Sequence, residues 1–556
     1  MATAAVVLPR LRARTRIRAR GRRATWQIEN TIIFAIACAF YIVVANYFVF
    51  HLNYMINDAV TRVDNAFDVL YSRDPHLGAI GFFWGPLPSF FDLPILAFKG
   101  IWPALASKAF AGSIEAAAFG AGTVVLFNVG LRWAGVIRPM RYIICAVWMI
   151  NPMITIFSAQ GMAEAPFMFF FVAATIVFLR WAESRRTSLL PLMGLLAGAS
   201  ALCRNEALLF AVVMGIGVIV MSIRHRPAGW RQVETEALLY GLPCVLMIML
   251  WLGTAAILFH DPLYLLHATG FYGLTQAPVI GGTVAGAGGA ATSASDAFAS
   301  AAWTVISHCI LLFPAVLAFL ALLGARLVVK EYRIPGIFLA LFGALTPALD
   351  IFLNWRGYGP FLFLRYQIVI IPWTFLIALY VLRSLKRRFA IFSSMVALAM
   401  AALLGISNIF TAFTLSNADI ASEEAPLVQA IQTGHPVPGG GDYGALLGAP
   451  QTVADIMRLD TDHGAVLCDS AYCFTLNMVA PDPKLFVVTS DRDFEGASSQ
   501  PLVYHVEYFL VSGSPRDRLN VMYPGLYQDG AGFGALVGEV SGGWRLYRIT
   551  GPTPRG

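Results

Sequence analysis

The side chain with the clearest chemical capacity in this sequence is a carboxylate that follows the first apolar segment. Asp58 stands within residues 57–66, shortly after an apolar run that begins at Thr31. A carboxylate at a membrane surface can take the proton from an acceptor hydroxyl, as sugar transfer from a lipid phosphate requires. It can also hold a divalent cation or orient a hydroxyl. The structural alternative is an N-cap that begins a short helix.

The rest of this first connecting segment has the composition of a loop at a membrane interface. Arg62 and Asp64 follow the carboxylate closely and are candidates for substrate contacts. His76 stands in a polar turn and is a further candidate, with a structural histidine as the alternative. Residues 82–102 begin with an aromatic, proline-rich stretch and continue as a segment suited to a helix lying on the bilayer. We therefore expect the loop at 51–108 to shape a cavity at the membrane surface.

Two arginines stand close to the ends of later apolar runs. A charged side chain next to the apolar part of a membrane costs free energy, so Arg204 and Arg365 are expected to face a cavity or a partner. A guanidinium can bind a phosphate through two parallel hydrogen bonds, which makes both residues candidate phosphate ligands. An ion pair with Glu164 or Glu206 is the alternative for Arg204. For Arg365 the alternative is a side chain that extends to the membrane interface.

A second carboxylate opens one of the apolar runs. Glu164 precedes Pro166, and an acidic residue in the first turn of a helix is favoured by the helix dipole. The chemical interpretation is that this carboxylate lies beside Asp58 and supports its role. Both interpretations remain open from the sequence.

Composition indicates the elements that must position these side chains. Of the 556 residues 58% are hydrophobic and only 13% are charged, which points to lipid as the main solvent. Runs of about 20 apolar residues are long enough to cross a bilayer as helices. We expect an α-helical polytopic membrane protein with about eleven transmembrane helices. The apolar runs lie near 31–50, 109–131, 140–158, 163–181, 188–203, 206–223, 237–259, 302–324, 336–353, 367–383 and 390–415.

The distribution of basic residues predicts the orientation of the chain. The formal net charge is +7, and eight arginines precede the first apolar run. The positive-inside rule makes residues 1–30 a cytoplasmic segment rather than a nucleic-acid-binding arm. Basic clusters then recur in alternate connections, which places the first loop and the tail outside the cytoplasm. The predicted location is a bacterial plasma membrane, and no phosphate-binding loop for ATP is present.

The tail at 416–556 has the pattern of a small extracytoplasmic α/β domain. Apolar stretches predict buried strands, and part of an amphipathic helix is expected at 452–458. Trp544 begins a final stretch that resembles an edge strand. Cys468 and Cys473 are free to form a disulfide outside the cytoplasm, but their spacing leaves the geometry open. No spacing of Cys and His resembles a zinc site. The buried strands are expected at 465–467, 485–488 and 508–511.

The transmembrane part, 31–415, resembles the GT-C glycosyltransferases, which are multi-span enzymes that use polyprenyl-phosphate sugars. The resemblance implies a GT-C-like fold, with Asp58 as catalytic base. It departs from the family in having Asn57 where many members carry a second adjacent acid, and it lacks the Trp-Trp-Asp signature of oligosaccharyltransferases. The other matching pieces are residues 161–167 with Glu164, 194–206 with Arg204, 260–264 with Asp261 and Tyr264, and 364–367 with Arg365 and Tyr366.

The resemblance implies sugar transfer from a polyprenyl-phosphate donor to an extracytoplasmic acceptor, which could be a cell-envelope glycan, a lipid or a protein. Arg365, Arg204 and Tyr366 would hold the donor phosphate, and Asp261 and Tyr264 would contact substrate. The pattern identifies no particular cofactor, and a divalent cation at Asp58 is compatible with it. The alternatives are a transporter or flippase, a ligase or polymerase of lipid-linked saccharides, and a non-catalytic scaffold. The sugar, the acceptor and the stereochemistry are not encoded in any recognisable pattern.

Overall fold

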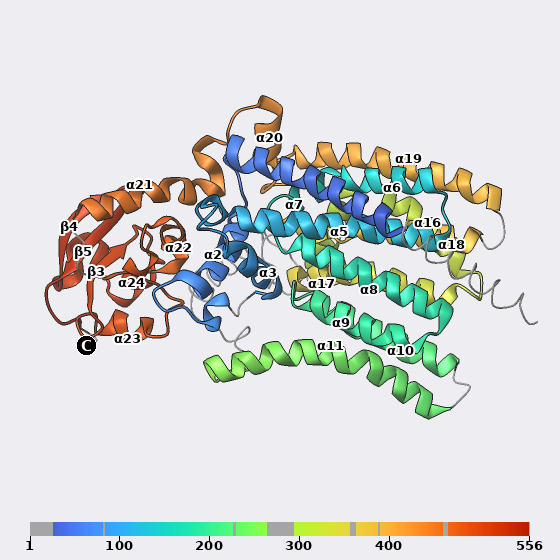
Figure 1. Ribbon diagram of the computed structural model, residues 1–556, viewed down its shortest axis with the longest axis horizontal. Coiled ribbons are helices and arrows are strands. Elements are labelled where there is room, and N and C mark those ends of the chain that lie inside the picture. The colour runs from blue at the N-terminus through green and yellow to red at the C-terminus, as the bar shows by residue number, and fades with distance from the viewer. Residues whose placement is uncertain are drawn as a thin grey trace, which may run out of the picture.

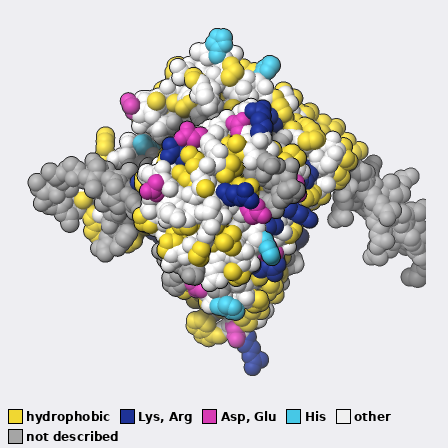
Figure 2. Space-filling view, turned by 90° about the vertical axis from the view of Figure 1, so that its left-hand side faces the viewer, with side chains coloured by type: hydrophobic (Ala, Val, Ile, Leu, Met, Phe, Trp, Pro, Cys, Tyr) yellow, Lys and Arg dark blue, Asp and Glu magenta, His cyan; other side chains and the backbone are white. Residues whose placement is uncertain are grey.

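The computed structural model describes residues 26–81, 84–225, 229–263, 294–355, 363–386, 390–459 and 465–554. An elongated bundle of helices carries a small α/β domain at one end (Figure 1). Seen from that end, acidic, basic and histidine side chains are interspersed over the surface (Figure 2), as expected for a face in water. The expectation of a polytopic helical protein with a C-terminal α/β domain is confirmed.

Eight helices in the described residues are long and apolar enough to cross a membrane, so the chain is a multi-pass membrane protein. A ninth candidate span is bent by 97° between α15 and α16. The eight are Trp26–His51, α5 (Phe110–Ala134), α8 (Glu164–Ser184), α10 (Ala207–Arg224), α11 (Trp230–Phe259), α17 (Arg333–Trp355), Leu364–Leu385 including α18 (Ile370–Lys386), and α19 (Ala390–Leu415).

The remaining apolar runs are helical but interrupted or short. The run at 140–158 is divided by Asn151 and Pro152 into α6 (Arg138–Met149) and α7 (Pro152–Phe157). Pro314 similarly separates α15 (Ala294–Leu312) from α16 (Ala315–Leu327), since proline cannot continue the hydrogen-bonding of the preceding turn. The run at 188–203 gives only the short α9 (Leu190–Ala201). The count of eleven spans therefore stays a prediction.

The first loop folds into short helices at the end of the bundle that faces the C-terminal domain. Arg73 forms ion pairs with Asp491, at 3.1 Å, and with Asp493. The buried carboxylate of Asp68 accepts hydrogen bonds from Ser490, at 2.7 Å, and from Asn477. These contacts hold the first loop against the C-terminal domain. The helices are α2 (Asn57–Tyr71), α3 (Leu87–Leu96) and α4 (Ala104–Ser107).

The C-terminal domain is built on a five-stranded mixed sheet in the order β2-β1-β3-β5-β4. β1 is parallel to β2 and β3, whereas β5 is antiparallel to both β3 and β4. The strands are β1 (Ala465–Cys468), β2 (Phe486–Val487), β3 (Val506–Val511), β4 (Gly534–Val540) and β5 (Trp544–Ile549). The helices of this part are α20 (Ala425–Thr433), α21 (Gly444–Arg458), α22 (Ser470–Val479), α23 (Phe494–Ser499), α24 (Arg518–Met522) and α25 (Leu526–Asp529).

The prediction that the strand beginning at Trp544 is an edge strand was wrong. It lies inside the sheet, whose two edges are β4 and β2. The sequence of β4, Gly-Ala-Leu-Val-Gly-Glu-Val, has a weak strand propensity because two of its seven residues are glycine. Cys468 and Cys473 are joined in a disulfide between the end of β1 and α22.

Candidate active site

A cavity of about 360 Å³ lies at the end of the helix bundle that faces the C-terminal domain. It brings together six of the residues singled out from the sequence, from four separate parts of the chain. These are Asp58, Arg62, Glu164, Arg204, Arg365 and Tyr366. Glu206, Asp350 and Trp84 are also among its lining residues.

Asp58 enters the cavity from the first turn of α2. The residue that precedes this helix, Ile56, has extended backbone angles, and its N–H donates to the side-chain oxygen of Gln160 at 3.0 Å. Asp58 makes no side-chain cap for its helix, so the N-cap alternative is not what the structure shows. Its carboxylate is 36% exposed and accepts a hydrogen bond from the Nη2 of Arg365 at 2.8 Å. The carboxylate thus remains reachable while a cation holds it in place.

The corner before α8 is formed by a close approach of two glycines. Gly161 has a φ of 71°, and a Cβ on it would stand 2.7 Å from the carbonyl carbon of Gly112 in α5. Only glycine permits both the backbone angle and this contact. The corner carries Gln160, which fixes the start of α2, and turns Glu164 into the cavity. Local backbone geometry therefore places both carboxylates in one site.

Arg365 is buried, in a short 3-10 turn that precedes α18. Besides its bond to Asp58, its Nε lies 3.0 Å from Oε2 of Glu423. These two atoms are not aligned for a hydrogen bond, so the second contact is purely electrostatic and is an ion pair when Glu423 is ionised. A side chain extending to the interface, the alternative considered for Arg365, is not what the structure shows. The guanidinium lies instead between the carboxylate of Asp58, which lines the cavity, and that of Glu423, which does not.

Arg204 is also held by two carboxylates, one from Glu164 and one from Glu206. The ion-pair alternative for this residue is thus present, with both of the partners that the sequence suggested. The ring of Tyr366 contacts both cations, with its centroid 5.6 Å from the guanidinium carbon of Arg204 and 5.6 Å from that of Arg365. Cation–π contacts with one shared ring favour two like charges that lie close together. A pair of neighbouring guanidiniums is well suited to an anion with several oxygen atoms.

Besides Asp350, two acidic residues near this site were missed from the sequence, Glu423 and Glu424. They follow the last span, in the part of the chain that was attributed wholly to the C-terminal domain. Burial raises the pKa of Glu423 to about 8, against the opposing effect of Arg365. Burial also raises the pKa of Glu424 to about 7. The only signal in the sequence was a pair of adjacent acids just beyond an apolar run.

Several candidates from the sequence do not line the cavity. Asp64 lies on the buried face of α2, where burial and then Asp68 raise the pKa of its carboxyl group. The Nδ1 of His76 lies 2.7 Å from the carbonyl oxygen of Asp74, in a local turn. Asp261 accepts a hydrogen bond from the N–H two residues further on. Tyr264 lies outside the described residues. Arg62 does line the cavity, and its guanidinium carbon is 4.9 Å from the ring centre of Trp84.

The described residues do not fit a resident divalent cation. They contain no group of three or more His, Cys, Asp or Glu side chains arranged to hold a metal ion. Asp58 and Glu164 are instead paired with Arg365 and Arg204. Their charge is thus already balanced by guanidinium groups, and we derive no chemical step through a metal.

Comparison with known proteins identifies the fold. The crystal structure of ArnT from Cupriavidus metallidurans bound to undecaprenyl phosphate superposes with a TM-score of 0.51 and 12% identity, over 94% of this chain and 99% of that chain. Its apo structure gives a TM-score of 0.48 and 12% identity, over 96% and 100%. The oligosaccharyltransferase AglB from Archaeoglobus fulgidus gives 0.43 and 13%, over 90% and 70%. No protein-family profile and no curated protein sequence matches the chain. The match to undecaprenyl-phosphate-bound ArnT shows that this chain has the GT-C fold.

Proposed function

We propose that the protein is a membrane glycosyltransferase that moves a sugar from a polyprenyl-phosphate donor to an acceptor hydroxyl. One observation carries the proposal: Asp58 and Arg365 meet at 2.8 Å in a cavity that also holds a second guanidinium. A base and an anion-binding group within one small site are what this reaction needs. The GT-C fold, and the undecaprenyl phosphate bound to ArnT, agree with a lipid phosphate as donor.

The reaction would be a single displacement at the anomeric carbon. The acceptor oxygen forms a bond to this carbon as Asp58 takes the hydroxyl proton. The bond between the carbon and the phosphate oxygen breaks at the same time, and its electron pair leaves with the polyprenyl phosphate. Arg365 and Arg204 bind the phosphate oxygens and stabilise the charge that develops on them. Entry of the donor would draw Arg365 away from Asp58 and free the carboxylate to act as base.

The site would face away from the cytoplasm of a bacterial plasma membrane. Arg185, Arg224, Lys330 and Arg383 surround a cavity at the opposite end of the bundle. The positive-inside rule assigns that end to the cytoplasm and the C-terminal domain to the outside. The acceptor would accordingly be an envelope glycan, a lipid or a protein, and the donor would enter from the bilayer. The domain would hold α2 in place and so position Asp58.

A transfer assay tests the proposal. The purified protein in liposomes is incubated with radiolabelled polyprenyl-phosphate mannose or arabinofuranose and a membrane extract as acceptor. Asp58→Asn should lower turnover at least about a hundredfold, because an amide cannot accept the proton. Asp419→Asn, an exposed acid beyond α19, is the matched control and should leave turnover unchanged. Full turnover in a folded Asp58→Asn protein would refute Asp58 as the base, and no transfer by the wild type from any polyprenyl-phosphate sugar of a mixed pool would refute the proposal.

A further inference from the structure

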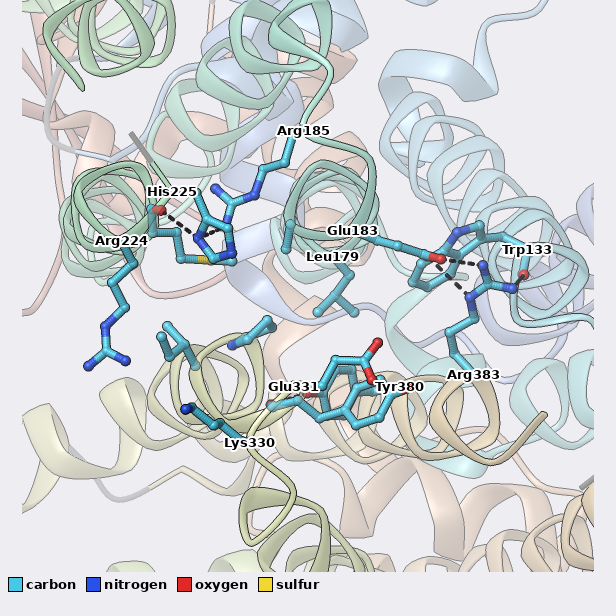
Figure 3. A pocket seen from close by; sticks show the side chains of 15 residues that line it. Trp133, Leu179, Glu183, Arg185, Arg224, His225, Lys330, Glu331, Tyr380 and Arg383 are labelled. Atoms are coloured by element: carbon cyan, nitrogen blue, oxygen red, sulfur yellow. Dashed lines mark hydrogen bonds and ion pairs between the residues drawn. The ribbon is translucent and has the colours of Figure 1, made fainter. Parts of the chain in front are cut away.

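A second cavity lies at the end of the helix bundle opposite to Asp58. Its volume of about 890 Å³ exceeds that of the candidate active site. It is lined by residues from the distal ends of α8, α10, α17 and α18 (Figure 3). Along α8, the 19 residues that separate Glu164 from Glu183 correspond to about 28 Å. This cavity is therefore separate from the site proposed for sugar transfer.

Cations outnumber anions around this second cavity. Arg185, Arg224, Lys330 and Arg383 line it, against Glu183 and Glu331. Arg383 is neutralised within the fold, because its guanidinium binds Glu183 through two contacts, at 3.1 and 2.5 Å. Figure 3 shows this pair on one side of the cavity, beside Trp133. The positive charge that remains available comes from the other three cations.

These three cations have binding capacity that the described residues do not use. Arg185 packs on Trp181, and its Nη2 lies 2.9 Å from the Nδ1 of His225. Its Nη1 is buried and has no hydrogen-bond partner in the described part of the chain, which is a costly state for a charged donor. Arg224 and Lys330 form no ion pair with any described carboxylate, and Figure 3 draws both without a dashed contact. All three donors suit an anion with several acceptor oxygens.

The wall of the cavity is apolar, which distinguishes it from a site for a small soluble anion. Leu179, Met221 and Ile334 contribute aliphatic surface. Tyr332 and Tyr380 pack edge to face with ring centres 6.2 Å apart, and the hydroxyl of Tyr380 donates to the carbonyl of Tyr332. A ligand that filled this space would therefore need an apolar part as well as an anionic group.

We propose that this cavity binds the phosphate headgroup of an anionic phospholipid. The phosphodiester would accept hydrogen bonds from Arg185, Arg224 and Lys330, and the glycerol and upper acyl chains would cover the apolar wall. Basic pockets between helices at the cytoplasmic side of a membrane are suited to such headgroups, and this leaflet supplies anionic lipids. A free phosphate shares the anionic chemistry but would leave the apolar wall in water.

Lipid titration of the purified full-length protein, followed by native mass spectrometry, tests this site. The probes are phosphatidylglycerol, phosphatidylcholine and glycerol phosphate. The cavity variant is Arg224→Gln with Lys330→Gln. The control is Arg186→Gln with Arg333→Gln, two basic residues of the same end that do not line the cavity.

The cavity variant should bind phosphatidylglycerol about tenfold more weakly or worse, and the control should bind it like the wild type. Phosphatidylglycerol should also bind better than phosphatidylcholine and glycerol phosphate. Equally weakened binding of phosphatidylglycerol by both variants would show that the lipid responds only to the positive charge of this surface, and it would overturn the proposal. Glycerol phosphate that binds as tightly as the lipid would equally overturn it, in favour of a soluble phosphate. The unfolding temperatures of the variants without added lipid serve as the check on folding.

Discussion

Glu423 should make donor binding depend on pH. Its carboxyl group lies 3.0 Å from the Nε of Arg365, the residue proposed to bind the donor phosphate. When ionised, Glu423 competes for this guanidinium and repels the phosphate. When protonated, Glu423 neither competes for the guanidinium nor repels the phosphate. A bound phosphate would raise the pKa of Glu423 further, so binding takes up a proton, and affinity falls as the pH rises through the pKa of the free protein.

The size of the effect follows from a pKa of about 8 for Glu423. At that pKa the group is about one tenth ionised at pH 7 and about nine tenths ionised at pH 9. If the donor binds only the neutral form, affinity falls about tenfold over this interval. Glu423→Gln carries no charge and should bind the donor with nearly equal affinity at both values.

The assay is a binding titration of a polyprenyl-phosphate sugar between pH 7 and 9. This donor is a phosphodiester, so its own charge stays constant over the range. Glu539→Gln, which changes an exposed acid on β4, is the control and should keep the wild-type slope. A flat profile in the wild type, or the same slope in Glu423→Gln, would refute the assignment of Glu423 as a competitor of the phosphate.

Two further predictions concern the C-terminal domain. Arg73→Ala leaves the fully buried Asp491 without its main cation and should destabilise the docked domain by roughly 2–3 kcal/mol, measured as a lower unfolding temperature. Arg458→Ala, which loses only an exposed pair, is its control, and equal effects of the two would show that Arg73 does not clamp the loop. Because Cys468 and Cys473 form a disulfide, five cysteines of the denatured, unreduced protein should react with iodoacetamide. After reduction, all seven should react. Seven reactive thiols without reduction would contradict it.

The residues that the sequence could identify are those whose signal is local. Four charged residues stand next to the ends of apolar runs: Asp58, Glu164, Arg204 and Arg365. Their position relative to a membrane span can be inferred from composition alone. Their meeting in one cavity could be expected only from the resemblance. Asp58 and Arg365 are 307 residues apart, and no local pattern records such a contact.

What the sequence could not provide depends on tertiary packing. Asp350 stands inside an apolar run, three residues before its end, and only the fold turns it toward the cavity, where its carboxylate accepts a hydrogen bond from Gln367. Glu423 reaches the site because the chain returns to the bundle after α19 before it enters the α/β domain. The number of spans stays a prediction for a related reason. Whether a proline such as Pro314 ends a span or bends it depends on the helices packed around it.

The most direct test of the account is a cryo-electron microscopy map of the protein with bound polyprenyl phosphate. We expect phosphate density in the cavity at the end facing the C-terminal domain, within hydrogen-bonding distance of Arg365, with the carboxylate of Asp58 released from that guanidinium. A lipid phosphate seated elsewhere, with the bond between Asp58 and Arg365 intact, would contradict it.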